Sequence, residues 1–140
     1  MALPPFINLE IVTPDRPLIK EQVDEVEIPA ADGYMGVWPG HTPLLAMLSI
    51  GQLWYRKGQD KFYLSIAFGF VEVLPDRVTV LAQIAERPED IDLQRAEAAR
   101  QRAQELLAKP TLEMDFERAR IAMMKSLIRL QVAARTRTRV

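Results

Sequence analysis

Cysteine is absent from this chain of 140 residues, and histidine occurs once, at position 41. Without cysteine the chain has no disulfide, no thiolate nucleophile and no cysteine-based zinc site, which fits a reducing compartment. A single histidine leaves no zinc site of ordinary composition. Nothing in the sequence pairs the three serines, Ser49, Ser65 and Ser126, with His41 as nucleophile and base. We therefore do not expect an enzyme that acts alone.

Long apolar runs and phosphate-binding loops are missing as well. No stretch approaches the roughly 18 apolar residues of a membrane-spanning helix, and the N-terminus lacks the pattern of a secretion signal. Neither of the glycine-rich nucleotide motifs, G-x-x-x-x-G-K-[ST] and G-x-G-x-x-G, occurs. We expect a soluble cytoplasmic protein, with peripheral membrane association left open.

The first 86 residues are typical of a β domain. All six glycines lie between Gly33 and Gly69, and eight of the ten prolines precede position 76. Apolar and polar residues alternate over residues 7–11 and 62–68, which predicts strands, and residues 56–61 predict a hairpin turn. Many short strands with turns about every ten residues favour a β-sandwich or a β-barrel.

The remaining residues are typical of two helices. Residues 88–108 begin with proline and acidic residues and continue with alanine, glutamine, arginine and leucine. A break at residues 109–111 precedes a second amphipathic segment, residues 112–140. The short connection predicts an antiparallel hairpin, in which Ala98, Ala99 and Ala103 would permit close approach.

Charge is distributed unevenly between these parts. Residues 111–140 carry seven basic and three acidic residues, a net charge of +4, whereas the first 110 residues carry 11 basic and 16 acidic ones, a net charge of −5. Such asymmetry indicates an acidic partner for the C-terminal segment. A solvated helix face is the alternative interpretation.

The only histidine lies in the segment "GVWPGHTPLL", residues 36–45. Pro39 fixes its own φ, Gly40 can adopt a positive φ, and Pro43 favours an extended conformation at the residue before it. The segment therefore predicts a stiff corner that presents Trp38, His41 and Leu44. Such a corner suits either plain turn structure or contact with a partner better than proton transfer.

The order of motifs resembles that of a known family. The segments "INLEIVTPDRP", "GYMGVWPGHTPLL" and "GFVEVLPDRVTVLAQIAERPEDIDLQRAEAA" follow one another as in the epsilon subunits of the bacterial F-type ATP synthase. The resemblance covers essentially the whole chain. It implies an N-terminal β-sandwich of about ten strands in residues 1–86 and a C-terminal antiparallel two-helix hairpin in residues 87–140.

The resemblance also implies a function. The chain would be a non-catalytic subunit of the central rotor stalk, peripheral at the cytoplasmic face of the cell membrane. Its sandwich would hold the gamma subunit and rest on the ring of c subunits, coupling proton-driven rotation to the catalytic head. In an extended state its helices would reach the alpha and beta subunits and inhibit ATP hydrolysis. No cofactor would be required and no nucleic acid would bind.

Some members of this family bind ATP between the two helices, at the motif that stands here as "IDLQRA", residues 91–96. The resemblance implies a regulatory ATP site formed by Glu86, Ile91, Asp92, Arg95, Arg102, Lys125 and Arg129. Lys125 stands where nucleotide-binding relatives tend to have arginine, and lysine lacks the bidentate fork. Salt bridges within and between the helices are the alternative interpretation of the same residues.

Contacts with gamma or the c ring would involve Tyr34, Trp38, His41 and Leu44. Tyr34 and Met35 stand where many relatives carry an acid followed by leucine, so an aromatic contact would replace an electrostatic one. With this resemblance, the interface interpretation of the His41 corner is favoured over plain turn structure. The alternative function is a free-standing β-sandwich binding module with a basic helical tail.

Overall fold

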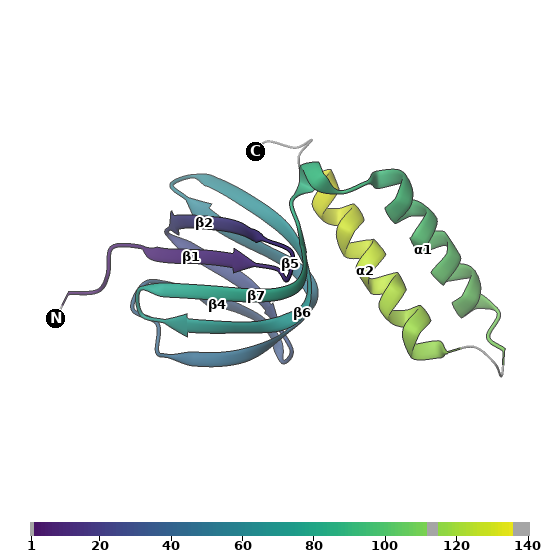
Figure 1. Cartoon of the computed structure of the whole chain (residues 1–140), viewed down its shortest axis with the longest axis horizontal. Coiled ribbons are helices and arrows are strands. Elements are labelled where there is room, and N and C mark those ends of the chain that lie inside the picture. Colours follow the sequence, from purple (N-terminus) through teal and green to yellow (C-terminus); the bar gives the residue numbers. More distant parts are fainter. Residues whose placement is uncertain (1, 112–114, 136–140) are drawn as a thin grey trace. The chain divides into compact units, whose positions relative to one another are not determined.

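The computed structural model describes residues 2–111 and 115–135 of the chain. The chain divides into two compact units, Met1–Ala85 and Glu86–Val140. The predicted fold class, a β-sandwich followed by two helices, is confirmed (Figure 1).

The first unit is a single folded sheet with the strand order β2-β1-β7-β6-β5-β3-β4. Its seven strands are β1 (Ile7–Val12), β2 (Pro17–Val23), β3 (Glu25–Ala30), β4 (Gly33–Val37), β5 (Leu44–Lys57), β6 (Asp60–Leu74) and β7 (Arg77–Glu86). Neighbouring pairs are antiparallel where successive strands form hairpins, whereas β1 and β7 run parallel.

The core follows from period-two alternation in the strands. Ile7, Leu9 and Ile11 of β1 are fully buried, and the residues between them are partly exposed. Val71 and Val73 of β6 are likewise fully buried. The alternation predicted for residues 62–68 is only partly seen, because Leu64, Ser65, Ile66 and Ala67 are all buried. Consecutive buried residues indicate that both faces of β6 are covered at this point.

The described residues form seven strands where the resemblance implies about ten, and two of these strands are long. β5 has 14 residues and β6 has 15, and they pair along most of their length, from Leu44 with Val73 to Lys57 with Asp60. The hairpin predicted around Gly58 is confirmed, with φ +63° at that glycine. The strand predicted at residues 62–68 is therefore part of the longer strand β6.

The second unit contains a short 3₁₀ helix, η1 (Pro88–Asp90), and two α-helices, α1 (Leu93–Ala108) and α2 (Phe116–Ala134). The side chains of Asp92 and Asp115 cap α1 and α2 by accepting hydrogen bonds from the backbone N–H groups of Arg95 and Arg118, both at 3.1 Å. α1 and α2 lie side by side as a hairpin (Figure 1).

Small residues form the seam between the two helices. Ala96 and Ala103 of α1 are buried, as are Ala119, Ser126 and Ala133 of α2, and each set repeats every seven residues. Small side chains at such a repeat let two helix backbones approach closely. Of the alanines expected to do this, Ala103 does, whereas Ala98 is exposed and Ala99 only half-buried. Neither α1 nor α2 has a stretch long and apolar enough to span a membrane.

Candidate functional site

The predicted corner is a hydrogen-bonded turn. The backbone N–H of His41 donates to the carbonyl oxygen of Trp38 at 3.2 Å, and Gly40 between them has φ +88°. Proline at the second position and a positive-φ glycine at the third are the signature of a type II turn. A further bond, from the N–H of Gly40 to the carbonyl oxygen of Pro75 at 2.7 Å, ties the turn to the end of β6. The corner is therefore rigid, as the prolines and glycine predict.

His41 is held by its own turn. Its Nδ1 lies 2.6 Å from the carbonyl oxygen of Thr42, a contact that requires the proton on Nδ1. Trp38 next to it is 61% exposed. Within the described residues, no cluster of three histidine, aspartate or glutamate side chains is placed to hold a metal ion. The corner thus presents an imidazole held by a hydrogen bond and an exposed indole.

The side chain of Tyr34 on β4 reaches over the neighbouring strand β3 to β5. Its hydroxyl accepts a hydrogen bond from the backbone N–H of Gln52 at 3.1 Å. A Cβ at Gly51 would lie 2.6 Å from that hydroxyl oxygen, so the ring occupies space that only glycine leaves open. Tyr34 is 56% exposed in this fixed position.

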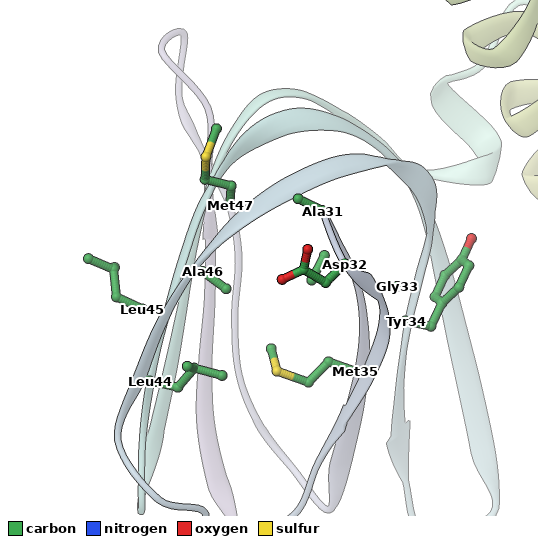
Figure 2. A pocket seen from close by; sticks show the side chains of 10 residues that line it. Ala31, Asp32, Gly33, Tyr34, Met35, Leu44, Leu45, Ala46 and Met47 are labelled. Atoms are coloured by element: carbon green, nitrogen blue, oxygen red, sulfur yellow. The ribbon is translucent and has the colours of Figure 1, made fainter.

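A shallow hollow lies between the β3–β4 turn and the start of β5 (Figure 2). Tyr34 and Leu44 both line it, together with Asp32, Met35 and Met47. The backbone N–H of Ala31 donates to the carbonyl oxygen of Met47 at 2.8 Å and fixes the turn against the strand. In Figure 2 the side chains of Tyr34 and Leu45 lie on opposite sides of this hollow. Two of the four predicted interface residues are therefore brought together here, and Trp38 and His41 lie on the corner that follows β4.

Next to the hollow is an apolar face that sequence reasoning missed. We call Leu45, Met47, Phe70 and Leu81 the outer apolar face. All four are at least half exposed, and Met47 pairs directly with Phe70 across β5 and β6. A signal was present, because residues 44–48 are five consecutive apolar residues, which places apolar side chains on both faces of a strand. On the inner face Leu48 is buried in the core and Ala46 packs against it, whereas Leu44 at the strand start and the outer set are exposed.

In the second unit an ion pair joins two of the predicted ATP-site residues. Arg129 Nε lies 2.7 Å from Glu86 Oε1, and Arg129 Nη2 donates to Glu86 Oε2 at 3.2 Å. Both side chains are about one-fifth exposed. Only the Nη2 contact has hydrogen-bond geometry, so the pair is a close ion pair with one hydrogen bond rather than a bidentate one. It joins the segment before η1 to the last third of α2.

The remaining predicted residues have different surroundings. Ile91 is buried, and the carboxylate of Asp92 is used by the cap of α1. Arg95 and Arg102 are exposed and seven residues apart, each one position before a seam alanine. Lys125 is half-buried and directly precedes the seam residue Ser126. The basic residues therefore border the seam on both helices, while Arg129 is paired with Glu86.

The excess positive charge near the C-terminus lies partly outside the described residues. Glu113, Arg137 and Arg139 of the charged set, and most of the arginine-rich end 134–140, are not described. Within the described part, Arg120 pairs with Glu117 in α2 at 2.9 Å. This pair fits the interpretation of a solvated helix face for that position.

Comparison with known families matches both units. The model of the ATP synthase delta/epsilon chain β-sandwich domain matches residues 6–88, and that of the delta/epsilon chain long α-helix domain matches residues 89–134. The chain is 50% identical to the ATP synthase epsilon chain of Solibacter usitatus over 131 residues, 94% of this chain and 98% of that one. It is 45% identical to the ATP synthase epsilon chain of Syntrophobacter fumaroxidans over 130 residues, 93% of this chain and 97% of that one.

A solved structure supports the same assignment. A chain in the mitochondrial ATP synthase of Euglena gracilis, a structure of OSCP, F1 and c-ring, superposes with a TM-score of 0.80 at 26% identity. The match covers 95% of this chain and 84% of that one. Two domains of one family, in the family's order, define the class of protein as a non-catalytic subunit of ATP synthase rather than a free-standing binding module. The chain belongs to the delta/epsilon chain family of ATP synthase, as the resemblance to epsilon subunits implied.

Proposed function

We propose that residues 1–86 are the docking domain of a central-stalk subunit, which holds gamma, rests on the c ring and couples ring rotation to the catalytic head. The observation that carries this proposal is the outer apolar face, Leu45, Met47, Phe70 and Leu81, exposed on a sheet whose inner face is already filled. Contiguous exposed apolar side chains on a soluble domain mark an interaction site. The complex would place the subunit at the cytoplasmic face of the membrane as a peripheral protein.

The predicted interface residues complete this surface. Tyr34 and Leu44 border the hollow beside the outer apolar face, and Trp38 and His41 form the rigid corner. Rigid aromatic side chains lose little entropy on binding, which favours them as anchors.

Binding to the alpha/beta/gamma core of the complex, prepared without this subunit, tests the docking proposal. Met47→Gln replaces an exposed apolar side chain at the centre of the face and should weaken binding about tenfold. Lys20→Gln on β2 is the matched control, because the Lys20 side chain is 85% exposed and lies on another part of the sheet. Equal affinity of the Met47→Gln variant and the wild type would remove the outer apolar face from the interface.

Residues 87–140 form the regulatory part in this proposal, with helices that separate, extend toward the alpha and beta subunits and inhibit ATP hydrolysis. Each helix carries stabilising contacts of its own that separation would leave intact. These are the aspartate caps and the Glu97–Arg100 and Glu117–Arg120 pairs. The net positive charge of residues 111–140 supports contact with an acidic surface.

ATP is the proposed regulatory ligand of the folded hairpin. Arg95, Arg102 and Lys125 border the seam and supply positive charge for phosphates, and Ile91 and Asp92 adjoin it. Arg129 is engaged with Glu86, so a nucleotide would have to compete for its guanidinium. Weak binding follows, and ATP at a concentration equal to its Kd would stabilise the hairpin by only about 0.4 kcal/mol. A full switch from 1:99 to 99:1 needs about 5.5 kcal/mol, so docking of the extended helices must supply most of the difference.

Calorimetry of the full chain with millimolar ATP tests the nucleotide site. Arg95→Ala should abolish the heat of binding, and Arg120→Ala, which removes a helix arginine paired with Glu117, should leave it unchanged. Absence of heat in the wild type would leave the salt-bridge interpretation of these residues in place.

A further inference from the structure

Trp38 is the largest exposed side chain of the rigid corner, and the turn does not fix its ring. The turn hydrogen bonds involve backbone atoms of Trp38, Gly40 and His41, so they hold the main chain. The indole is 61% exposed and follows the last residue of β4. Its ring lies 6.0 Å from the guanidinium carbon of Arg56 on β5, at the outer limit of a cation–π contact.

Arg56 is itself held from several directions. Its Nε donates to Glu25 Oε1 at 2.7 Å, and its Nη1 donates to the carbonyl oxygen of Gly58 at 2.7 Å and lies 3.5 Å from Asp24 Oδ2. The carboxylate of Asp24 also accepts a hydrogen bond from the N–H of Gly58 at 2.7 Å, so Arg56, Asp24 and Gly58 each contact the other two. The hydrogen bond to Glu25 is the main cause that raises the pKa of Arg56 above its ordinary value. The guanidinium is thus a fixed, permanently charged plane at the end of the β5–β6 hairpin.

We propose that Arg56 is a positioning residue that orients the indole of Trp38 for partner docking. The proposal rests on the docking function proposed for the corner. A planar guanidinium held by carboxylates on its edge leaves its face available to an aromatic ring. An oriented indole loses less entropy when it is buried by gamma, so Arg56 contributes to affinity without touching the partner.

The chain supplies two matched controls. Lys57, the next residue, pairs with Glu21 at 2.7 Å, so it is a cation in an ion pair on the same hairpin. Lys61 on β6 lies 4.2 Å from the centre of the Trp54 ring, so it makes a cation–π contact with the other tryptophan. The chain has two tryptophans, so the effect of removing Arg56 on Trp38 can be compared with the effect of removing Lys61 on Trp54.

Fluorine NMR of the full chain labelled with 5-fluorotryptophan tests the positioning directly. Two signals are expected, and Trp54→Phe assigns them. Arg56→Met should shift and narrow the Trp38 signal and leave the Trp54 signal largely in place. Lys61→Met should do the reverse, and Lys57→Met should change neither. A Trp38 signal that is the same in Arg56→Met and wild type would overturn the proposal.

A double-mutant cycle measures the consequence for docking. Arg56→Met should bind the alpha/beta/gamma core about two- to fivefold more weakly, and Trp38→Ala about tenfold more weakly. In the Trp38→Ala background, Arg56→Met should cause no further loss. A full further loss there would show that Arg56 acts independently of Trp38 and would contradict the proposal.

A second variant of Arg56 and the binding of Trp38→Ala distinguish a folding defect, and a failure of the docking function, from a failure of the positioning proposal. Arg56→Met leaves the carboxylate of Glu25 without its guanidinium, so Arg56→Lys, which keeps a charge for Glu25, serves as the variant if Arg56→Met does not fold. Its Trp38 signal should also shift, because lysine lacks the planar face. If Trp38→Ala binds the core as well as the wild type does, the docking function of the corner fails, and the fluorine signals still decide the positioning.

Discussion

His41 ends a turn that its neighbours define completely. Pro39 and Gly40 set the backbone, and the imidazole Nδ1 contacts the carbonyl oxygen of Thr42, the residue after the turn. His41→Ala keeps the backbone hydrogen bond to Trp38, so the free energy of unfolding of the isolated chain should change by less than about 0.5 kcal/mol.

Binding of the His41→Ala variant to the alpha/beta/gamma core should weaken by about three- to tenfold, because the replacement removes the imidazole from the contact area of the corner. Titration calorimetry on the core measures this. Unchanged affinity would mean that His41 has a role in the turn only and does not contact the partner.

Gly69 is fixed by a close approach of another strand. It has φ +121°, and a Cβ would lie 2.0 Å from the carbonyl oxygen of Leu81, a backbone atom that cannot move aside easily. Gly69→Ala should therefore lower the free energy of unfolding by about 3 kcal/mol or more. Gly58→Ala is the control, since Gly58 also has a positive φ but nothing lies within 4 Å of the added carbon. Its cost should stay near 1 kcal/mol in urea unfolding. Equal losses in the two variants would refute the steric explanation.

Gly40 and Gly69 show how far the need for glycine at a position can be predicted from sequence. The conformation of Gly40 is visible in the motif, because Pro-Gly in a turn depends on adjacent residues. The requirement for Gly69 depends on Leu81, twelve residues later on another strand, so local pattern contains no sign of it.

At the scale of elements, α2 contains an ion pair that responds to acid. The hydrogen bond and charge of Arg120 lower the pKa of Glu117 below its ordinary value. A carboxylate with a lowered pKa in the folded state stabilises that state above the unfolded pKa of about 4.3, and the contribution is lost as pH falls through the folded value. The pair should therefore stabilise α2 at neutral pH and contribute nothing in strong acid.

Thermal melting of Glu117→Gln and Arg120→Gln tests this pair. Both variants should melt below the wild type at pH 7, and both differences should disappear by about pH 3. A difference that persists at pH 3 would show that the residues act through packing rather than charge.

The ion pair between Glu86 and Arg129 connects elements rather than stabilising one helix. Hydrogen bonds to charged groups contribute about 1.5–3 kcal/mol, and here the two side chains are largely buried. Glu86→Gln should therefore loosen α2 and increase amide hydrogen exchange over the last third of that helix.

The charge-reversed double variant, Glu86→Arg with Arg129→Glu, should restore much of the protection that either single variant loses. Exchange measured by mass spectrometry on the full chain gives the answer. Equal exchange in Glu86→Gln and wild type would mean that the pair does not hold the helix.

The sequence indicates which segments form strands and helices better than it indicates which of their faces are buried. Alternation over residues 7–11 predicts the buried face of β1 correctly, because a period of two leaves one choice of face. In the helix rich in alanine, Ala98 and Ala99 are indistinguishable by type from Ala96 and Ala103, and the second helix decides which are buried. The nucleotide-ligand role of Asp92 stays a prediction, whereas the structure shows that its side chain caps α1, a role that its position before the helix indicates.

At the scale of the whole molecule, the two units carry different kinds of surface. The sandwich has a filled core and an apolar outer face, whereas the second unit has a seam of small residues bordered by basic ones. Composition predicts this division, because all the glycines and most prolines lie in the first part, whereas alanine is denser in the second. The outer apolar face depends on the pairing of β5 with β6, which composition does not contain.

The central claim is that docking belongs to the sandwich and regulation to the helices. Reconstitution of the complex with a chain truncated after Glu86 tests it, with the full chain as control. We predict that the truncated chain binds the alpha/beta/gamma core with an affinity within about threefold of the full chain. We also predict that it supports proton-driven ATP synthesis and leaves ATP hydrolysis unchanged or raised. Loss of core binding by a truncated chain that retains its β-sheet circular dichroism would contradict the account.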